Sequence, residues 1–236
     1  MRLTTIIVLA VLAAGCVKAV TLTPTLTPEP PLDAQTILER VAIRLSDLQS
    51  AAFVLEHPMG STTLFPGLEM HRVTGVVDVG DEDFRIVVEA QSQVPRVYIE
   101  FTVVNAGEEV WMTDFLTGNW REVPKTAMPL DFSNLGGTLI DITSAVESPE
   151  LLGLEYVSGI ETRRIRGTMQ SEELAGLVPG AGGGVDIDVD LWVEVHQSLV
   201  YQMVLAGQVL STDKPDTERL LSLGEFNLPV VIDPPE

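Results

Sequence analysis

The sequence predicts an α+β fold, in which a large, curved antiparallel β-sheet (a half-barrel) has helices covering its concave face. Three observations predict it. Short strand-like segments follow one another closely between residues 52 and 124, which is typical of an antiparallel meander. Residues 185–195 alternate strictly between aliphatic and polar side chains, as a strand with one buried face does. Residues 33–50 repeat apolar side chains every three or four positions, as a helix lying on a sheet does.

The composition fits one globular domain without disulfides. The chain has 236 residues, with 14 Lys and Arg against 34 Asp and Glu, and a formal net charge of −20. Such an excess of carboxylates argues against a nucleic-acid partner, and against docking on anionic lipid through charge alone. The single cysteine forbids an intrachain disulfide, so the fold has to rest on its apolar core.

The amino terminus has the pattern of a secreted lipoprotein. Residues 3–14 form an apolar run that is too short to span a membrane but suits a signal peptide. The run leads into Ala13-Ala14-Gly15-Cys16, which resembles the lipobox of bacterial lipoproteins. We therefore expect residues 1–15 to be a signal peptide. An ordinary signal peptide followed by an accidental cysteine is the alternative.

The lipobox resemblance implies a covalent anchor at Cys16, made of a diacylglyceryl group and an amide-linked acyl chain such as palmitate. Two or more chains hold a protein stably on a membrane. Residues 16–32 are rich in Thr and Pro and lack apolar periodicity, so we expect an extended tether with a reach of about 3.1 Å per residue. Residues 33–236 then form a single domain outside the cytoplasm, held to the cell membrane by the anchor.

The first half of this domain is expected to be one helix followed by strands. The helix covers residues 33–50, and Asp33 is its expected N-cap. Turn signals such as Asn105-Ala106-Gly107 separate the segments that follow. The expected strands are residues 52–57, 71–79, 84–90, 97–103, 108–114 and 120–124.

The second half mixes both kinds of element. A helix is expected over residues 135–147 despite two glycines, and a hairpin over residues 154–169. A short helix over residues 171–177 and a glycine-rich loop over residues 180–184 precede the long strand, residues 185–195. That strand pairs with residues 199–209, and residues 220–226 and 230–232 are the last two strands.

The polar face of the long strand carries Asp186, Asp188, Asp190 and Trp192. A calcium site needs oxygens that converge from a tight turn, so we expect a solvated acidic face instead. Trp192 is expected to pack on an aromatic side chain or a helix, with stacking on a sugar as the alternative. The basic cluster Arg163, Arg164 and Arg166 is expected to be paired surface charge, with a lipid phosphate or sugar headgroup as the alternative partner.

No catalytic or metal-binding pattern is present in the sequence. The histidines, His57, His71 and His196, have no metal-ligand spacing, and His196 is expected to be exposed beside a turn. There is no Gly-x-Ser-x-Gly motif, and the glycine-rich loop lacks the Lys-Ser/Thr of a phosphate loop. We therefore expect no catalytic residue, no metal and no cofactor other than the lipid anchor, and we expect the protein not to be an enzyme.

Helices 33–50 and 135–147 are expected to cover the concave face imperfectly, leaving an apolar cavity that suits acyl chains. Tryptophan in place of Val189 or Leu191 should then block lipid uptake without unfolding the domain. The expected lining residues are Val41, Leu45, Val97, Ile99, Phe101, Val110, Met112, Leu139, Ile142, Ile187, Val189, Leu191 and Val193.

Several segments carry a family resemblance, in order, over most of residues 33–233. Among them are Val73-Thr74-Gly75, Val110-Trp111-Met112, Leu191-Trp192-Val193 and the closing Leu228-Pro229-Val230. In these segments the chain resembles the LppX/LprG-type bacterial lipoproteins, whose fold is similar to that of the LolA and LolB lipoprotein carriers. The glycine-rich loop departs from the expected family pattern.

The resemblance implies a cavity that holds an acylated lipid or glycolipid, and the transfer of that lipid within the cell envelope. A lipid exporter or an acceptor lipoprotein would be the partner, and the protein itself is expected to be a monomer. The alternative is a non-catalytic structural or sensory lipoprotein with the same fold and a filled core.

Overall fold

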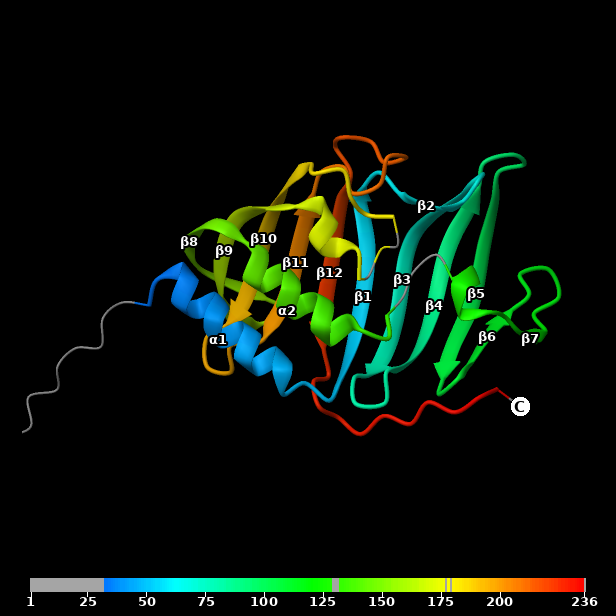
Figure 1. The fold of residues 1–236 in the computed structure, drawn as a ribbon, viewed down its shortest axis with the longest axis horizontal. Helices are drawn as coiled ribbons and strands as arrows, with labels where there is room; N and C mark the ends of the chain where they lie inside the picture. Colours follow the sequence, from blue (N-terminus) through cyan, green and yellow to red (C-terminus); the bar gives the residue numbers. More distant parts are fainter. Residues whose placement is uncertain (1–31, 129–131, 177, 179, 236) are drawn as a thin grey trace, which may run out of the picture. The chain divides into compact units, whose positions relative to one another are not determined.

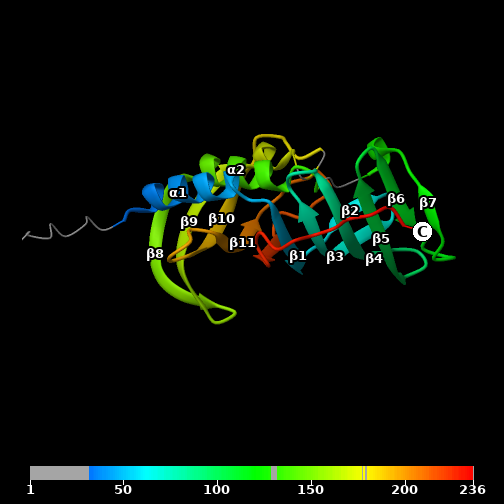
Figure 2. The ribbon, with the colours of Figure 1, turned by 90° about the horizontal axis from the view of Figure 1, so that it is seen from below.

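The computed structural model describes residues 32–128, 132–176, 178 and 180–235. The predicted signal peptide, Cys16 and nearly all of the predicted tether lie outside these residues. The described residues form one open, curled antiparallel sheet of twelve strands, with two α-helices, α1 (Ala34–Ser46) and α2 (Leu135–Ala145), on one side (Figures 1 and 2). The predicted α+β class and curved antiparallel sheet are confirmed.

The strands form two meanders joined by the first and last strands of the chain. Their order across the sheet is β7-β6-β5-β4-β3-β1-β12-β11-β10-β9-β8, with β2 paired to β3 alone. β12 therefore lies between β1 and β11, β7 and β8 are the two ends of this order, and β2 is paired on one side only (Figure 1). The bounds are β1 Ser50–Met59, β2 Thr62–Phe65, β3 Leu68–Asp78, β4 Asp83–Ser92, β5 Val97–Ala106, β6 Glu109–Thr113, β7 Trp120–Glu122, β8 Glu147–Val157, β9 Ile160–Gln170, β10 Asp186–Glu194, β11 Val200–Ala206 and β12 Glu218–Gly224.

The two α-helices begin and pack as the sequence predicts, although both are shorter than expected. The Thr36 backbone N–H donates to Asp33 Oδ1 over 2.8 Å, so Asp33 is the N-cap of α1, and this bond lowers the pKa of the Asp33 carboxyl. The buried side of α1 carries Ile37, Val41 and Leu45. Helices α1 and α2 pack against each other, and Figure 2 shows both over the part of the sheet from β8 to β1.

The structure differs from the prediction at several elements. β2 was not predicted, because four residues are too few for alternation to be recognised. Residues 230–232 form no strand: Val231 is 82% exposed, and β12 already has a partner on both sides. The short helix after β9 is a 3-10 turn over Ser171–Leu174, and a second such turn, Lys125–Ala127, follows β7.

Strand register gives the whole sheet one continuous apolar inner face. Residues paired across neighbouring strands share a face, and one such row runs from β6 to β12 through Met112, Val103, Ile86, Gly75, Phe53 and Leu223. The buried core of the described residues lies wholly between Ala34 and Leu223. The residues from Leu32 onward therefore contain a complete core of their own.

Candidate functional site

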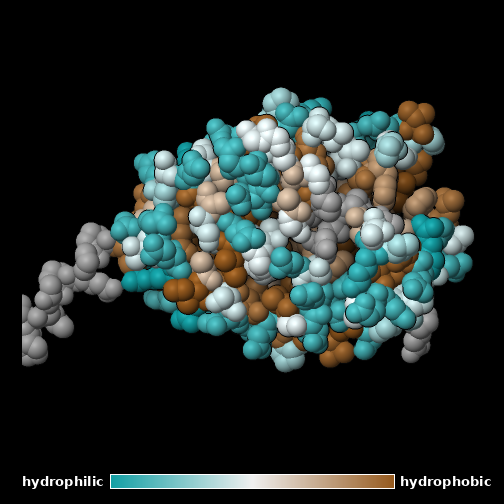
Figure 3. Space-filling model, in the orientation of Figure 1, coloured by the Kyte–Doolittle hydropathy of each residue, from teal (hydrophilic) through white to brown (hydrophobic). Residues whose placement is uncertain are grey.

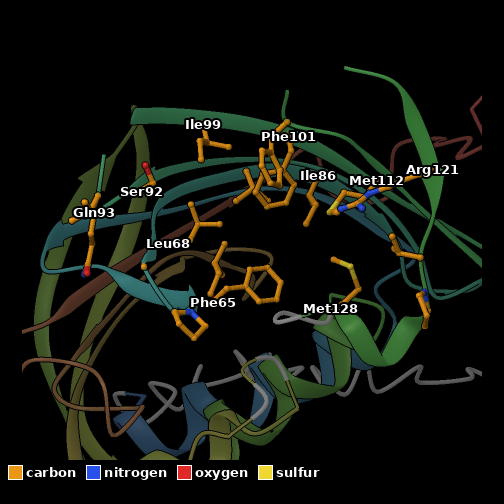
Figure 4. Close-up of a pocket in the computed structure, with 18 residues that line it drawn as sticks. Phe65, Leu68, Ile86, Ser92, Gln93, Ile99, Phe101, Met112, Arg121 and Met128 are labelled. Carbon is orange, nitrogen blue, oxygen red and sulfur yellow. The ribbon is translucent and has the colours of Figure 1, made fainter. Parts of the chain in front are cut away.

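The inner face is hollow over one half of the sheet. A cavity of about 810 Å³ lies against β3, β4, β5 and β6 (Figure 4). Its volume falls within the roughly 300–1,000 Å³ range of small-molecule sites. The strands contribute a wall of aliphatic, aromatic and thioether side chains: Leu68, Ile86, Val88, Ile99, Phe101 and Met112.

The opposite side of the cavity comes from segments outside the two α-helices. Phe65 ends β2, Pro66 and Gly67 form the turn to β3, and Val123 and Met128 flank the 3-10 turn after β7. These short segments cover the wall only in part. Phe65 is 42% exposed and Phe115, another lining residue, is 48% exposed. The cavity is therefore apolar and open to solvent.

Three predicted lining residues, Ile99, Phe101 and Met112, do line this cavity. The structure changes the placement of the other ten. Val97 is 48% exposed, Val110 is buried away from the cavity, and Ile142 lines a separate hollow of about 20 Å³. The remaining seven lie in the packed core with at most 1% exposure: Val41, Leu45, Leu139, Ile187, Val189, Leu191 and Val193.

The physical reason is that α1 and α2 fill the half of the inner face to which β10 belongs. Val189 and Leu191 are fully buried in one cluster with Ile37, Val41 and Leu139. A larger side chain at Val189 or Leu191 therefore has no void to enter, and overpacking of a core typically costs about 1–3 kcal/mol. We now expect tryptophan at these positions to destabilise the fold instead of blocking a cavity.

A buried polar network lies on the inner face between the two halves. Arg219 on β12 donates from Nε and a terminal nitrogen to Thr62 Oγ1, over 3.2 and 3.0 Å, and forms an ion pair with Asp213. The side chains of Arg219 and Asp213 are 3% and 0% exposed. Asp213 also accepts backbone N–H bonds from Val209 and Leu210. The charge of Arg219 is thus neutralised inside the protein.

His57 completes this network in its neutral form. Its Nδ1 lies 3.2 Å from the His71 carbonyl oxygen, which can only accept, so Nδ1 carries the hydrogen. Its Nε2 then accepts from the Thr62 hydroxyl over 2.8 Å. Burial is the main cause that lowers the pKa of His57 from 6.5 to about 4, and the nearby Arg219 charge adds to it.

On the outer face, Arg164 and Arg166 of β9 both pair with Asp190 of β10. Arg164 Nε donates to Asp190 over 2.8 Å, and the Arg164 guanidinium lies 4.8 Å from the centroid of the Trp192 ring. The Trp192 indole donates to Glu155 over 2.7 Å. Arg166 also pairs with Asp190. Burial raises the pKa of the Asp190 carboxyl, but its bonds to Arg164 and Arg166 lower it by more, so the net effect is a lowered pKa.

Paired surface charge is confirmed for Arg164 and Arg166, whereas Arg163, in register with the buried Val193, donates to the Val195 backbone carbonyl over 3.0 Å. Trp192 packs on Arg164 and, among the described residues, not on another aromatic ring.

The part of the chain that the structure describes offers no cluster of three or more His, Cys, Asp or Glu that could hold a metal ion. His196 is exposed, as predicted. None of the described helices is both long and apolar enough to cross a membrane.

Comparisons with known proteins agree on the family and the fold. A family model described as LppX_LprAFG lipoprotein matches residues 33–214. The crystal structure of LprF from Mycobacterium bovis is 20% identical, with a TM-score of 0.67, and the alignment covers 86% of this chain and 96% of that one. For the Mycobacterium tuberculosis lipoprotein LppX the identity is 15% and the TM-score 0.58, with 85% and 98% covered.

A LolA superfamily protein from Nitrosomonas europaea is a more distant match, with a TM-score of 0.27 at 12% identity over 85% of this chain and 95% of that one. A search of curated proteins gave no match. The two mycobacterial structures show that this open, curled sheet with two helices is a shared fold.

Proposed function

The chain belongs to the LppX_LprAFG lipoprotein family, and on this premise we propose that it binds an acylated lipid in the cavity against β3–β6 and carries or presents it within the cell envelope. The observation that carries the proposal is the unfilled apolar cavity. A structural or sensory lipoprotein with a filled core would leave no such space. The hollow of about 810 Å³ therefore supports the carrier over that alternative.

Burial of acyl chain is the driving force in this proposal. Each methylene moved from water into an apolar site contributes about 0.8 kcal/mol. A chain of about ten methylenes thus gains about 8 kcal/mol, comparable to the roughly 4–15 kcal/mol cost of association. A lipid whose chains lie along Ile86, Val88, Ile99 and Phe101 would also remove from water the apolar surface that the short covering segments leave open.

Anchoring completes the proposal. Cys16 would carry a diacylglyceryl group and an acyl chain, residues 16–32 would hold the domain away from the membrane, and the protein would act as an extracytoplasmic monomer without a cofactor or catalytic residue. A lipid exporter would load it, or an acceptor lipoprotein would receive its cargo. Replacing Cys16 with serine should move the protein from the membrane fraction to the soluble fraction, whereas unchanged membrane retention would contradict the anchor.

Native mass spectrometry tests the lipid-binding proposal. The protein is purified as residues 32–236, a part that contains the whole described core. We expect a mass higher than the polypeptide by one or more lipids, which solvent extraction releases and identifies. A mass equal to the bare polypeptide, both as purified and after incubation with membrane lipid extract, would favour the filled-core alternative.

A further inference from the structure

Among the described residues that line the cavity, Arg121 is the one charged side chain. It lies on β7, paired in register with Met112, and so ends the apolar row that crosses the inner face. Figure 4 shows its side chain reaching from β7 toward the cavity, near Met112. In a chain with 34 Asp and Glu, the described residues of the cavity wall include this cation and no carboxylate, a composition that favours an anionic ligand.

Arg121 and Arg219 are both on the inner face, yet only Arg219 has its charge compensated within the protein. Asp213 holds Arg219, whereas no carboxylate in the described ranges lies within 4.0 Å of the Arg121 guanidinium. The longer-range interaction of Arg121 is with Asp114. Asp114 Oδ1 already accepts from the N–H of Leu116 and from the N–H and hydroxyl of Thr117, at 2.9–3.1 Å. The N–H donors of the Arg121 guanidinium therefore remain available to a ligand.

The guanidinium group suits one class of headgroup. Its planar fork of N–H donors matches a carboxylate or a phosphate in bidentate geometry, and such charge-assisted bonds are stronger than neutral ones. Ile86 lies in the same row across the strands as Arg121. From Ile86 the cavity wall continues along β4 to Ser92, six residues further on, which is about 20 Å at a rise of about 3.3 Å per residue. An acyl chain can lie along this run with its anionic end at Arg121.

We propose that the cavity takes anionic amphiphiles, whose carboxylate or phosphate binds Arg121 while the acyl chain lies along β4 and β5. The inference rests on the proposed function, since it requires that the cavity hold lipid. Beyond lipid binding itself, the inference states that the headgroup of the lipid is negatively charged and that it binds at Arg121. Neutral acylated lipids would then be the weaker ligands of this site.

The experiment compares three probes with the same twelve-carbon chain: dodecanoate, dodecyl phosphate and 1-dodecanol. Delipidated protein of residues 32–236 is loaded with an apolar fluorescent dye, and each probe displaces it near neutral pH. Four proteins are compared: wild type, Arg121→Gln, Arg121→Lys and Arg85→Gln. Arg85 is exposed on the outer face of β4, so its substitution makes the same charge change outside the cavity.

We expect wild type to bind dodecanoate and dodecyl phosphate at least about tenfold more tightly than dodecanol, since a charge-assisted bond contributes roughly 1.5–3 kcal/mol and 1.4 kcal/mol corresponds to a factor of ten. Arg121→Gln should remove most of this difference and leave dodecanol binding within about twofold. Arg121→Lys should lie between the two, and Arg85→Gln should match wild type.

The outcomes that would overturn the inference differ from those that would overturn the function. Equal affinity for all three probes, in wild type and in Arg121→Gln alike, would overturn the anionic headgroup but keep lipid binding. Inorganic phosphate that binds as tightly as dodecyl phosphate would also overturn it, since Arg121 would then hold a free anion. If wild type displaces no dye with any probe, the proposed function itself is contradicted.

Discussion

The two halves of the inner face both carry apolar side chains, but they differ in the segments that cover them. Around β10, side chains such as Val189 and Leu191 are fully buried beneath α1 and α2. Around β5, Ile99 and Met112 are partly exposed and face a hollow of about 810 Å³. Figure 3 shows one face of the molecule, on which hydrophobic residues lie interspersed among hydrophilic ones. Strand alternation thus indicates which face is apolar, but the path of the covering segments decides whether it becomes core or cavity.

The largest expected effect is at the buried ion pair between the halves. Asp213→Ala would leave the Arg219 charge buried at 3% exposure without its partner. Breaking a buried pair in this way typically costs about 3–5 kcal/mol, so we expect a loss of that size in the free energy of unfolding, measured by urea denaturation. The matched change, Asp114→Ala, concerns a partly exposed carboxylate and should cost far less. Equal losses would show that Arg219 is not sealed from solvent.

Isoleucine truncation in each half compares the packed and hollow regions directly. Ile165 on β9 is fully buried in the core, whereas Ile99 on β5 lines the cavity. Ile165→Ala should cost about 2–5 kcal/mol, because it leaves a void among well-packed neighbours. Ile99→Ala should cost clearly less, since one side of Ile99 already lacks partners. Thermal and urea denaturation measure both, and an equal cost would contradict the assignment of a hollow half.

Acid should weaken the fold through His57. Its folded pKa is lowered from 6.5 to about 4, so between these values the unfolded chain binds a proton that the folded chain does not. The free energy of unfolding therefore falls as the pH drops from about 6.5 to about 4, by up to about 3 kcal/mol from this group. His57→Gln should flatten the pH dependence of unfolding in this window.

The control is His196→Gln, which changes an exposed imidazole and should keep the wild-type pH dependence. If His57→Gln and wild type lose stability in parallel, His57 is not held neutral by the buried network.

Much of the fold could be predicted from the sequence, because each element carries a local signal. Asp33 precedes the apolar periodicity of α1 and is its N-cap in the structure. The apolar residues that alternate along β4 and β10 in the sequence are the ones buried in the structure. The resemblance to LppX/LprG-type lipoproteins was confirmed by a family match over residues 33–214. β2 was missed because a four-residue strand on the sheet edge has no length over which to alternate.

The cavity was harder to predict, because its position depends on contacts distant in sequence. Ile86 and Val88 alternate as visibly as Ile187 and Val189, yet only the first pair faces the hollow. The helix spacing in α1 and α2 shows that they bury one side but not which strands they cover. Arg121 was not predicted, because its place on the apolar face follows from its register with Met112, and the buried Arg219 shows that a charge on this face can equally belong to the core.

The most direct test of the account is to fill the cavity and measure bound lipid. Ile99→Trp places a large side chain on the cavity wall, and Ile43→Trp makes the same change at a position 64% exposed on α1. In native mass spectrometry, folded Ile99→Trp should retain much less lipid than wild type, and Ile43→Trp should retain the wild-type amount. Full lipid loading in a folded Ile99→Trp protein would contradict the placement of the lipid site against β3–β6.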